Sequence, residues 1–267
     1  MLLFPSFTEG LAALHECVDA GFMPCVARLS DEGETELIFA AKPPSHGLKA
    51  TVERGVKRLL KARGYVAPAA CVLGFEGPEA ITRPLRDEVL ARCKRRGAFD
   101  LGKGAGEKWK KTRYDVPYLR DYMMDYGLLC DAFETATVWS RVRPLYQEAR
   151  RALQEAYRSE TGHGGYLGCH LSHLYGTGAC LYFTIGVRAR EGSSPAEINA
   201  QYTAIKTAAA DAFVKNGGTL SHHHAVGYEH GPWMRHEHSE PALRAFARIK
   251  EELDPKGIMA PGNLAGR

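Results

Sequence analysis

Hydrophobic positions along the first hundred residues alternate between a helical period and short apolar runs. Leu11 and Leu14 lie on one face of a helix that is expected to begin near residue 8 and to end at Gly21. An apolar run at 25–29 predicts a strand, and a second run at 37–40 is expected to pair with it across a polar turn. Further elements of these two kinds are expected as helices at 47–63 and 78–96 and as a strand at 70–75.

The rest of the chain continues this alternation and contains a clear hairpin. Two β-rich runs, 166–174 and 179–187, are joined by a turn with two glycines, which is typical of a β-hairpin. The other expected elements are a loop at 100–108, helices at 114–126, 139–157, 194–216 and 240–253, and strands at 132–137 and 221–224. Because the strands are linked by hairpins rather than by parallel βαβ units, the pattern predicts an α+β domain, an antiparallel sheet covered by helices.

Composition is that of an ordinary globular protein. Of the 267 residues, 45% are hydrophobic and 25% are charged, and a net charge of +4 is too small to argue for a nucleic-acid partner. The seven cysteines include no CxxC pair, which indicates reduced thiols, most of them in the core. The sequence shows no signal peptide and no apolar stretch of the ~20 residues that a membrane helix needs, so a cytoplasmic location is expected.

The beginning of the chain suggests that a segment precedes it. A strand-like run, Leu2–Phe4, follows the initiator methionine directly. The sequence has no G-x-G-x-x-G after a strand and no P-loop, so it carries no nucleotide-binding motif of its own.

Six histidines within seventeen residues are the strongest chemical signal: His222, His223, His224, His230, His236 and His238. Imidazole titrates near neutral pH, so such a cluster is suited to proton transfer. A solvated loop with one structural histidine is the alternative. A metal site is not expected, because zinc ligands are usually spaced and three adjacent histidines cannot all face one ion.

A tyrosine and two arginines are further candidates. Tyr175 shares a face with His173 in an extended strand and could act as a general base, although a half-buried tyrosine with a wet hydroxyl is the simpler interpretation. Arg28 and Arg120 lie among apolar or aromatic neighbours, and their guanidinium groups suit a phosphate or a carboxylate. The alternative is a local pair of Arg28 with Asp31 or of Arg120 with the next residue, an aspartate.

Several blocks together resemble the alkyldihydroxyacetonephosphate synthases and their bacterial relatives, a family of vanillyl-alcohol-oxidase-type flavoproteins. The most specific block is Gly-Gly-Thr-Leu-Ser-His-His-His-Ala-Val-Gly at 217–227. The other blocks follow in the family's order, at 24–31, 133–139, 175–183, 232–233 and 253–263. The resemblance covers essentially the whole chain.

This resemblance implies a domain and a chemistry. Residues 1–267 would form the C-terminal substrate-binding cap, built on a duplicated ferredoxin-like unit, and the N-terminal FAD-binding domain would be absent from this chain. The implied reaction exchanges the acyl group of an acyl-dihydroxyacetone phosphate for a fatty alcohol in ether lipid synthesis, with FAD held mainly by the missing domain. The chain alone would then be inactive.

The resemblance also assigns residues by position. Tyr175 resembles the family's proton-abstracting tyrosine, and His223 and His224, with His222 beside them, resemble its active-site histidines. Arg28 and Arg120 match arginines of the family's active site and would bind the substrate. The remaining assignments, to cofactor binding, are Glu134, Thr135 and Asn263.

Two other functions stay open. One is an FAD-dependent oxidase or dehydrogenase of the same superfamily, acting on a 2-hydroxy acid or a phenol. The other is a non-enzymatic metal-binding or orphan domain. The expected partners are the FAD-binding domain and a lipid-like phosphorylated substrate, without nucleic acid, and a homodimer and a peripheral association with a membrane are left open.

Overall fold

The computed structural model describes residues 1–41, 47–114, 117–220 and 223–263, which fold into two compact units. Met1–Ala132 and Gly164–Ala189 form unit 1, and Phe133–His163 and Arg190–Arg267 form unit 2.

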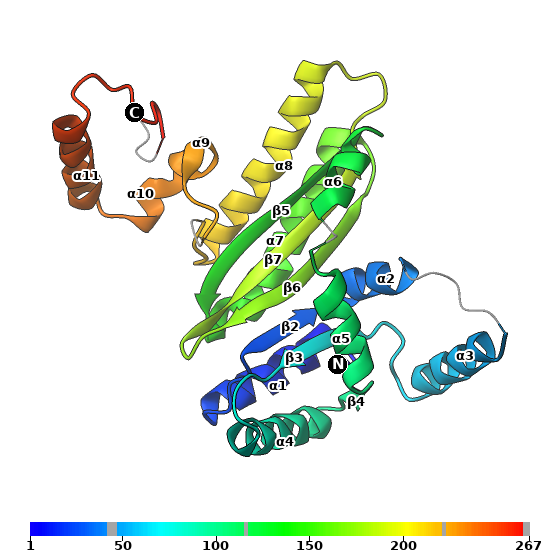
Figure 1. Ribbon diagram of the computed structural model, residues 1–267. Coiled ribbons are helices and arrows are strands. Elements are labelled where there is room, and N and C mark those ends of the chain that lie inside the picture. The colour runs from blue at the N-terminus through cyan, green and yellow to red at the C-terminus, as the bar shows by residue number, and fades with distance from the viewer. Residues whose placement is uncertain (42–46, 115–116, 221–222, 264–267) are drawn as a thin grey trace. The chain divides into compact units, whose positions relative to one another are not determined.

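Seven strands form one sheet in the order β4-β1-β3-β2-β6-β7-β5 (Figure 1). They are β1 Leu2–Phe4, β2 Val26–Ser30, β3 Ala69–Gly74, β4 Phe99–Asp100, β5 Leu128–Val138, β6 Tyr166–Leu174 and β7 Gly178–Arg188. The registered pairs β1–β3, β1–β4, β2–β3, β2–β6 and β6–β7 are all antiparallel. The predicted α+β class with an antiparallel sheet is therefore confirmed.

The strand order also shows the predicted duplication. In the first half, β4-β1-β3-β2 is the order of a β-α-β-β-α-β ferredoxin-like unit. In the second half, β5, β6 and β7 repeat the places of β1, β2 and β3, and long helices again follow the first and third of these strands. The two repeats meet where β2 pairs with β6.

The helices of unit 1 are α1 Phe7–Asp19, α2 Glu32–Ala40, α3 Gly47–Ala62, α4 Glu79–Arg95, α5 Lys103–Thr112 and α6 Pro117–Met124. Of these, α1 and α2 pack on the strands of the sheet. The Ser6 side chain accepts from the Glu9 N–H at the start of α1, which packs on β1, β2 and β3 and against α4. Gly10 allows a close approach to β2, because a Cβ there would lie 2.6 Å from Leu29 Cδ1.

Unit 2 contains two long packed helices followed by a series of short ones. The helices are α7 Trp139–Thr161, α8 Pro195–Lys215, α9 Gly227–His230, the 3-10 turn Gly231–Trp233, α10 Met234–Glu237 and α11 Glu240–Leu253. α7 and α8 pack on each other and bury Leu145, Leu153, Ile205 and Phe213. Ser194 forms a capping box at the start of α8, as its Ser-Pro-x-Glu start predicts.

Several expectations from the sequence are wrong. The run 37–40 is not a strand but part of α2, because the Asp31 side chain accepts from the Glu34 N–H and so begins a helix where a turn was expected. The segment 100–108 is not a loop but contains the start of α5. The strand expected at 221–224 is not present at 223–224, which bend, and 221–222 lie outside the described residues.

Two further observations concern the cysteines and the helices. All seven cysteines are free thiols, and only Cys25 is exposed, as expected for small core residues. Across the described part of the chain, every helix is too short or too polar to cross a bilayer.

Candidate functional site

Two histidines and a buried glutamate of unit 2 form a compact group, the histidine–glutamate cluster (Glu134, His223 and His224). Glu134 comes from β5, and its side chain is only 1% exposed. Its Oε2 atom lies 3.1 Å from His223 Nε2 and 3.2 Å from His224 Nε2. The two imidazole rings lie edge to face, with their centroids 4.6 Å apart. The side chains of His223 and His224 are 55% and 32% exposed, so the cluster joins a buried charge to an open surface.

The backbone after the histidines explains why two neighbours in sequence reach one carboxylate. Ala225 has a φ of +66°, in the left-handed region that L-residues seldom adopt. Its carbonyl oxygen lies 2.9 Å from His230 Nδ1, which stabilises this bend. In a strand, adjacent side chains would point to opposite faces, whereas the bend lets both imidazoles approach Glu134.

The segment before the histidines is held closely against β5. Thr219 N–H donates to the Ala136 carbonyl at 3.0 Å. A Cβ at Gly218 would lie 2.3 Å from Thr135 Oγ1, so only glycine allows this approach. Glu237 of α10 accepts from the hydroxyl of Thr219 at 2.7 Å. These contacts hold Gly218 and Thr219 in place beside β5.

Several basic side chains lie near the cluster. Partial burial lowers the pKa of His224, and the nearby His223, His230 and Lys206 lower it further against the opposing effect of Glu134. Lys206 Nζ lies 2.7 Å from Glu229 Oε2 and 5.0 Å from the centre of the Phe133 ring. The Lys206–Glu229 pair was not found from the sequence, because its members are distant residues of α8 and α9.

Arg28 of unit 1 has a different partner from the one suggested by the sequence. Its Nη2 donates to Glu34 Oε1 at 2.7 Å, and His170 Nδ1 lies 3.0 Å from the same oxygen. Asp31 instead caps α2. Burial alone would raise the pKa of Glu34, but His170 and Arg28 outweigh it and hold that pKa at about 2. The His170 ring also stacks on Tyr182, 4.8 Å away. Arg28 therefore belongs to a network of interactions around the buried Glu34 carboxylate.

Because Glu34 interacts with Arg28 and His170, we expect the folding stability of unit 1 to fall at acid pH. The folded-state pKa of Glu34 lies below its ordinary 4.5, so its stabilisation is fully present above pH 4.5 and is lost as the pH falls towards about 2. The shift corresponds to about 3 kcal/mol of unfolding free energy. We expect Glu34→Gln to lower stability near neutral pH and to flatten the loss of stability between these two pH values in denaturant unfolding. Glu36→Gln, an exposed glutamate of the same helix, is the matched control. An unchanged pH dependence in Glu34→Gln would contradict the assignment.

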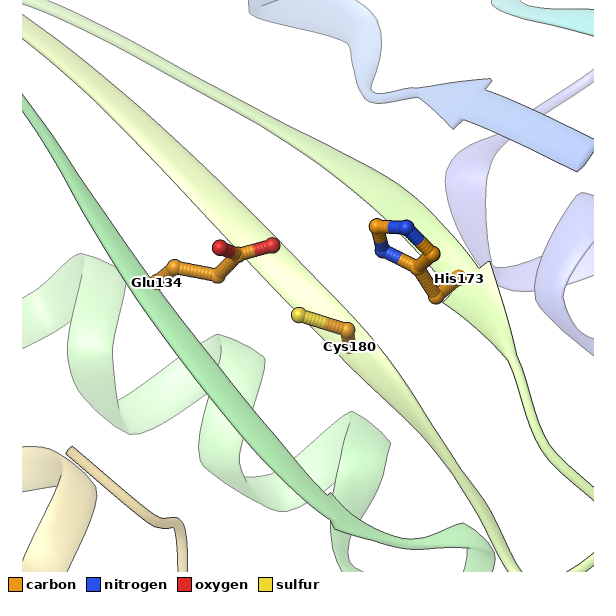
Figure 2. Close-up of side chains that lie close together, drawn as sticks. All are labelled: Glu134, His173 and Cys180. Atoms are coloured by element: carbon orange, nitrogen blue, oxygen red, sulfur yellow. The ribbon is translucent and has the colours of Figure 1, made fainter. Parts of the chain in front are cut away.

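Tyr175 lies at the turn between β6 and β7. Its N–H donates to the Gly178 carbonyl at 2.9 Å, and its side chain remains exposed. The Tyr175 and His173 rings are stacked within 7° of parallel, with centres 6.3 Å apart, so the two side chains lie on the same side as predicted. His173 pairs across the hairpin with the buried Cys180 (Figure 2, which also labels Glu134 of β5).

The remaining predicted residues have varied surroundings. Arg120 Nε donates to the Cys130 carbonyl at 3.1 Å, and its Nη1 lies 3.8 Å from Asp121, the local pair that was the alternative interpretation. Thr135 is fully buried. The Asn263 N–H donates to the Ala260 carbonyl at 3.1 Å. His222 lies outside the described residues.

The predicted site residues are divided between the two units. Arg28, Arg120 and Tyr175 belong to unit 1, and the histidine–glutamate cluster belongs to unit 2, with Thr135 and Asn263. Within unit 2 the structure brings His223, His224 and Glu134 together.

Comparison with known proteins agrees with the resemblance seen in the sequence. An alkyldihydroxyacetonephosphate synthase of Trypanosoma brucei brucei is 35% identical over 266 residues, which cover 98% of this chain and 42% of that protein. The enzyme of the same name from Dictyostelium discoideum is 33% identical over 265 residues, covering 98% and 43%. A solved alkyldihydroxyacetonephosphate synthase structure superposes with a TM-score of 0.76 at 27% identity, covering 98% of this chain and 44% of that one.

The chain thus spans less than half the length of these relatives. Residues 1–264 match the family model described as "FAD linked oxidases, C-terminal domain". The match includes nearly the whole chain and both units, so the chain belongs to the family of FAD linked oxidase C-terminal domains.

Proposed function

We propose that this chain is the substrate-binding and catalytic part of an FAD-dependent enzyme of the alkyldihydroxyacetonephosphate synthase type. Such an enzyme exchanges the acyl group of acyl-dihydroxyacetone phosphate for a fatty alcohol. The names of two similar relatives support this reaction. The histidine–glutamate cluster is the observation in this chain that carries the proposal, because it joins two accessible imidazoles to a buried carboxylate.

The residues of this chain fit the reacting part of a flavin better than its phosphates. His223 and His224 can exchange protons and hydrogen bonds at the polar edge of a flavin ring. By contrast, the sequence has neither a G-x-G-x-x-G motif after a strand nor a P-loop to hold a pyrophosphate. When bound, FAD would supply the electron-accepting ring for the reaction. Thr135 is fully buried, so its part in cofactor binding would be to pack under Gly218 rather than to touch the flavin.

The remaining roles come from the family resemblance, and the surroundings of each side chain favour some of them over others. Tyr175, exposed at a hairpin turn, would take the proton from the substrate carbon that carries the ester oxygen. Over the whole exchange the bond from this carbon to the ester oxygen breaks and a bond to the alcohol oxygen forms. His223 and His224 would carry the proton that the alcohol loses to the departing carboxylate, and the carbon would regain a proton in place of the one taken by Tyr175. Of the two arginines, Arg120 is the better candidate for the phosphate, because its side chain is 49% exposed. Arg28 already balances the charge of Glu34.

The last helix supports an FAD-binding domain as the partner. α11 carries Phe246, Ile249 and Leu253 on one face, and none of its residues is buried. An apolar face of this kind is usually covered in a folded protein. The relatives are more than twice as long as this chain, and their remaining length would supply the covering domain.

The test compares the chain alone with the chain joined to its FAD-binding domain. We expect the chain alone to fold, to lack the visible absorbance of flavin and to be inactive, because the pyrophosphate site lies elsewhere. Joined to the FAD-binding domain, it should convert acyl-dihydroxyacetone phosphate and a fatty alcohol into the ether product without consuming an electron acceptor.

Two results would argue against this proposal. Stoichiometric flavin absorbance in the chain alone would place the cofactor site within it. Reduction of an electron acceptor by a 2-hydroxy acid or a phenol, without ether formation, would instead support an oxidase or dehydrogenase of the same superfamily.

A further inference from the structure

We propose that the histidine–glutamate cluster is a binding site for a divalent transition-metal ion, with zinc as the ion that best suits its ligands. One carboxylate oxygen and one nitrogen from each imidazole lie within 4.8 Å of one another. All three ligands belong to unit 2, and nothing in the proposed flavin chemistry requires an ion there. Imidazole nitrogen and carboxylate oxygen are ordinary zinc ligands, and two histidines with one glutamate form a known catalytic zinc set.

The distances suit a small ion after a minor adjustment. Zinc binds these atoms at about 2.0–2.2 Å, so tetrahedral ligands lie roughly 3.4 Å from one another. The separations here are 3.1 Å from Glu134 Oε2 to His223 Nε2 and 3.2 Å to His224 Nε2. A widening of a few tenths of an ångström would bring both of these contacts to that spacing. His223 is more than half exposed, so its ring has room to move.

The sequence alone argued against a metal site, because neighbouring histidines in a strand point to opposite faces. The observed backbone removes this argument. Adjacent histidines in a strand cannot share an ion, but residues 223–224 bend, and Ala225 takes a left-handed φ of +66°. Such backbone is energetically costly for alanine and is concentrated at functional sites. The third ligand, Glu134, is 89 positions before His223 in the sequence, so no short spacing motif could reveal it.

The surroundings allow both the charge of an ion and an open coordination position. Lys206 is paired with Glu229 at 2.7 Å, which offsets its repulsion of a dication. The exposed sides of His223 and His224 leave a fourth position accessible, as in catalytic rather than closed structural zinc sites. An ion bound here would occupy the same Nε2 atoms that the proposed function uses for proton transfer, so, if that function holds, we expect bound zinc to slow turnover.

The test measures metal binding by the full 267-residue chain and needs no turnover. After treatment with a chelator and dialysis, we expect one zinc per chain by elemental analysis and the intense visible absorption of tetrahedral Co²⁺ on titration with cobalt. Loss of a partner that only orients a ligand already costs about 10–100-fold in affinity. Glu134→Gln, His223→Ala and His224→Ala should therefore each weaken zinc binding by at least about 100-fold.

His236→Ala and His238→Ala are the matched controls, since these exposed histidines of the same unit lie outside the cluster. They should bind zinc as the wild type does. Melting curves check that each variant folds, and His223→Ala, at an exposed position, keeps the test valid if the buried Glu134 proves essential for folding.

The proposal is overturned if the wild type binds no stoichiometric zinc, or if the three cluster variants bind it as tightly as the controls. The proposed enzyme activity is judged separately. Absence of zinc binding in a protein that forms the ether product would overturn the metal site and leave the proposed function intact. Stoichiometric zinc in a protein that forms no ether product would support the metal site and contradict the proposed function.

Discussion

Tyr175→Phe is expected to lower turnover by about 10²–10⁴-fold in the chain joined to its FAD-binding domain, the usual size of a general-base contribution. The change removes one hydroxyl and keeps the ring, so the stacking on His173 should persist. Because the Tyr175 side chain is exposed at a turn, its hydroxyl contributes little to folding, and the melting temperature should hardly change. Ether-product formation and a melting curve are measured on the same preparation.

Tyr118→Phe is the control for this result. Tyr118 lies on α6 of the same unit, is 79% exposed and has no assigned role. If Tyr175 is only a surface aromatic, both variants should have nearly normal activity. Turnover of Tyr175→Phe close to that of Tyr118→Phe would remove this residue from the catalytic group.

His223→Ala and His224→Ala are expected to have losses of the same size, about 10²–10⁴-fold each, because either imidazole would exchange a proton in the transition state. Both approach one oxygen of Glu134, so they should act as a unit. The loss in the double variant should therefore be smaller than the product of the single losses. The measurement is kcat of the joined protein for ether formation.

His236→Ala and His238→Ala again serve as controls and should retain full turnover. If the losses at His223 and His224 multiply in the double variant, the two residues act independently and the shared role of Glu134 fails. If both single variants are fully active, the cluster has no catalytic part, whatever it binds.

Local signals in the sequence determined most of the elements. The apolar spacing of α1, the Ser-Pro-x-Glu start of α8 and the glycine turn between β6 and β7 each depend on residues that are close in sequence. The same local logic led to the error at 37–40, where a helix cap at Asp31 and a turn have the same polar residues. Which one forms depends on packing, and α2 packs against β3 and β6.

The candidate site also has one part that could be predicted from the sequence and one part that only the fold decided. The histidine run, Tyr175 and the two arginines could be selected from the sequence because their residue types are unusual where they stand, and the family resemblance added their roles. Their partners could not, because Glu34 meets His170, and Glu134 meets His223, across separations that no spacing rule covers. Only the folded backbone, with the bend at Ala225 and the close approach of Gly218 to β5, decided that two neighbouring histidines reach one buried carboxylate.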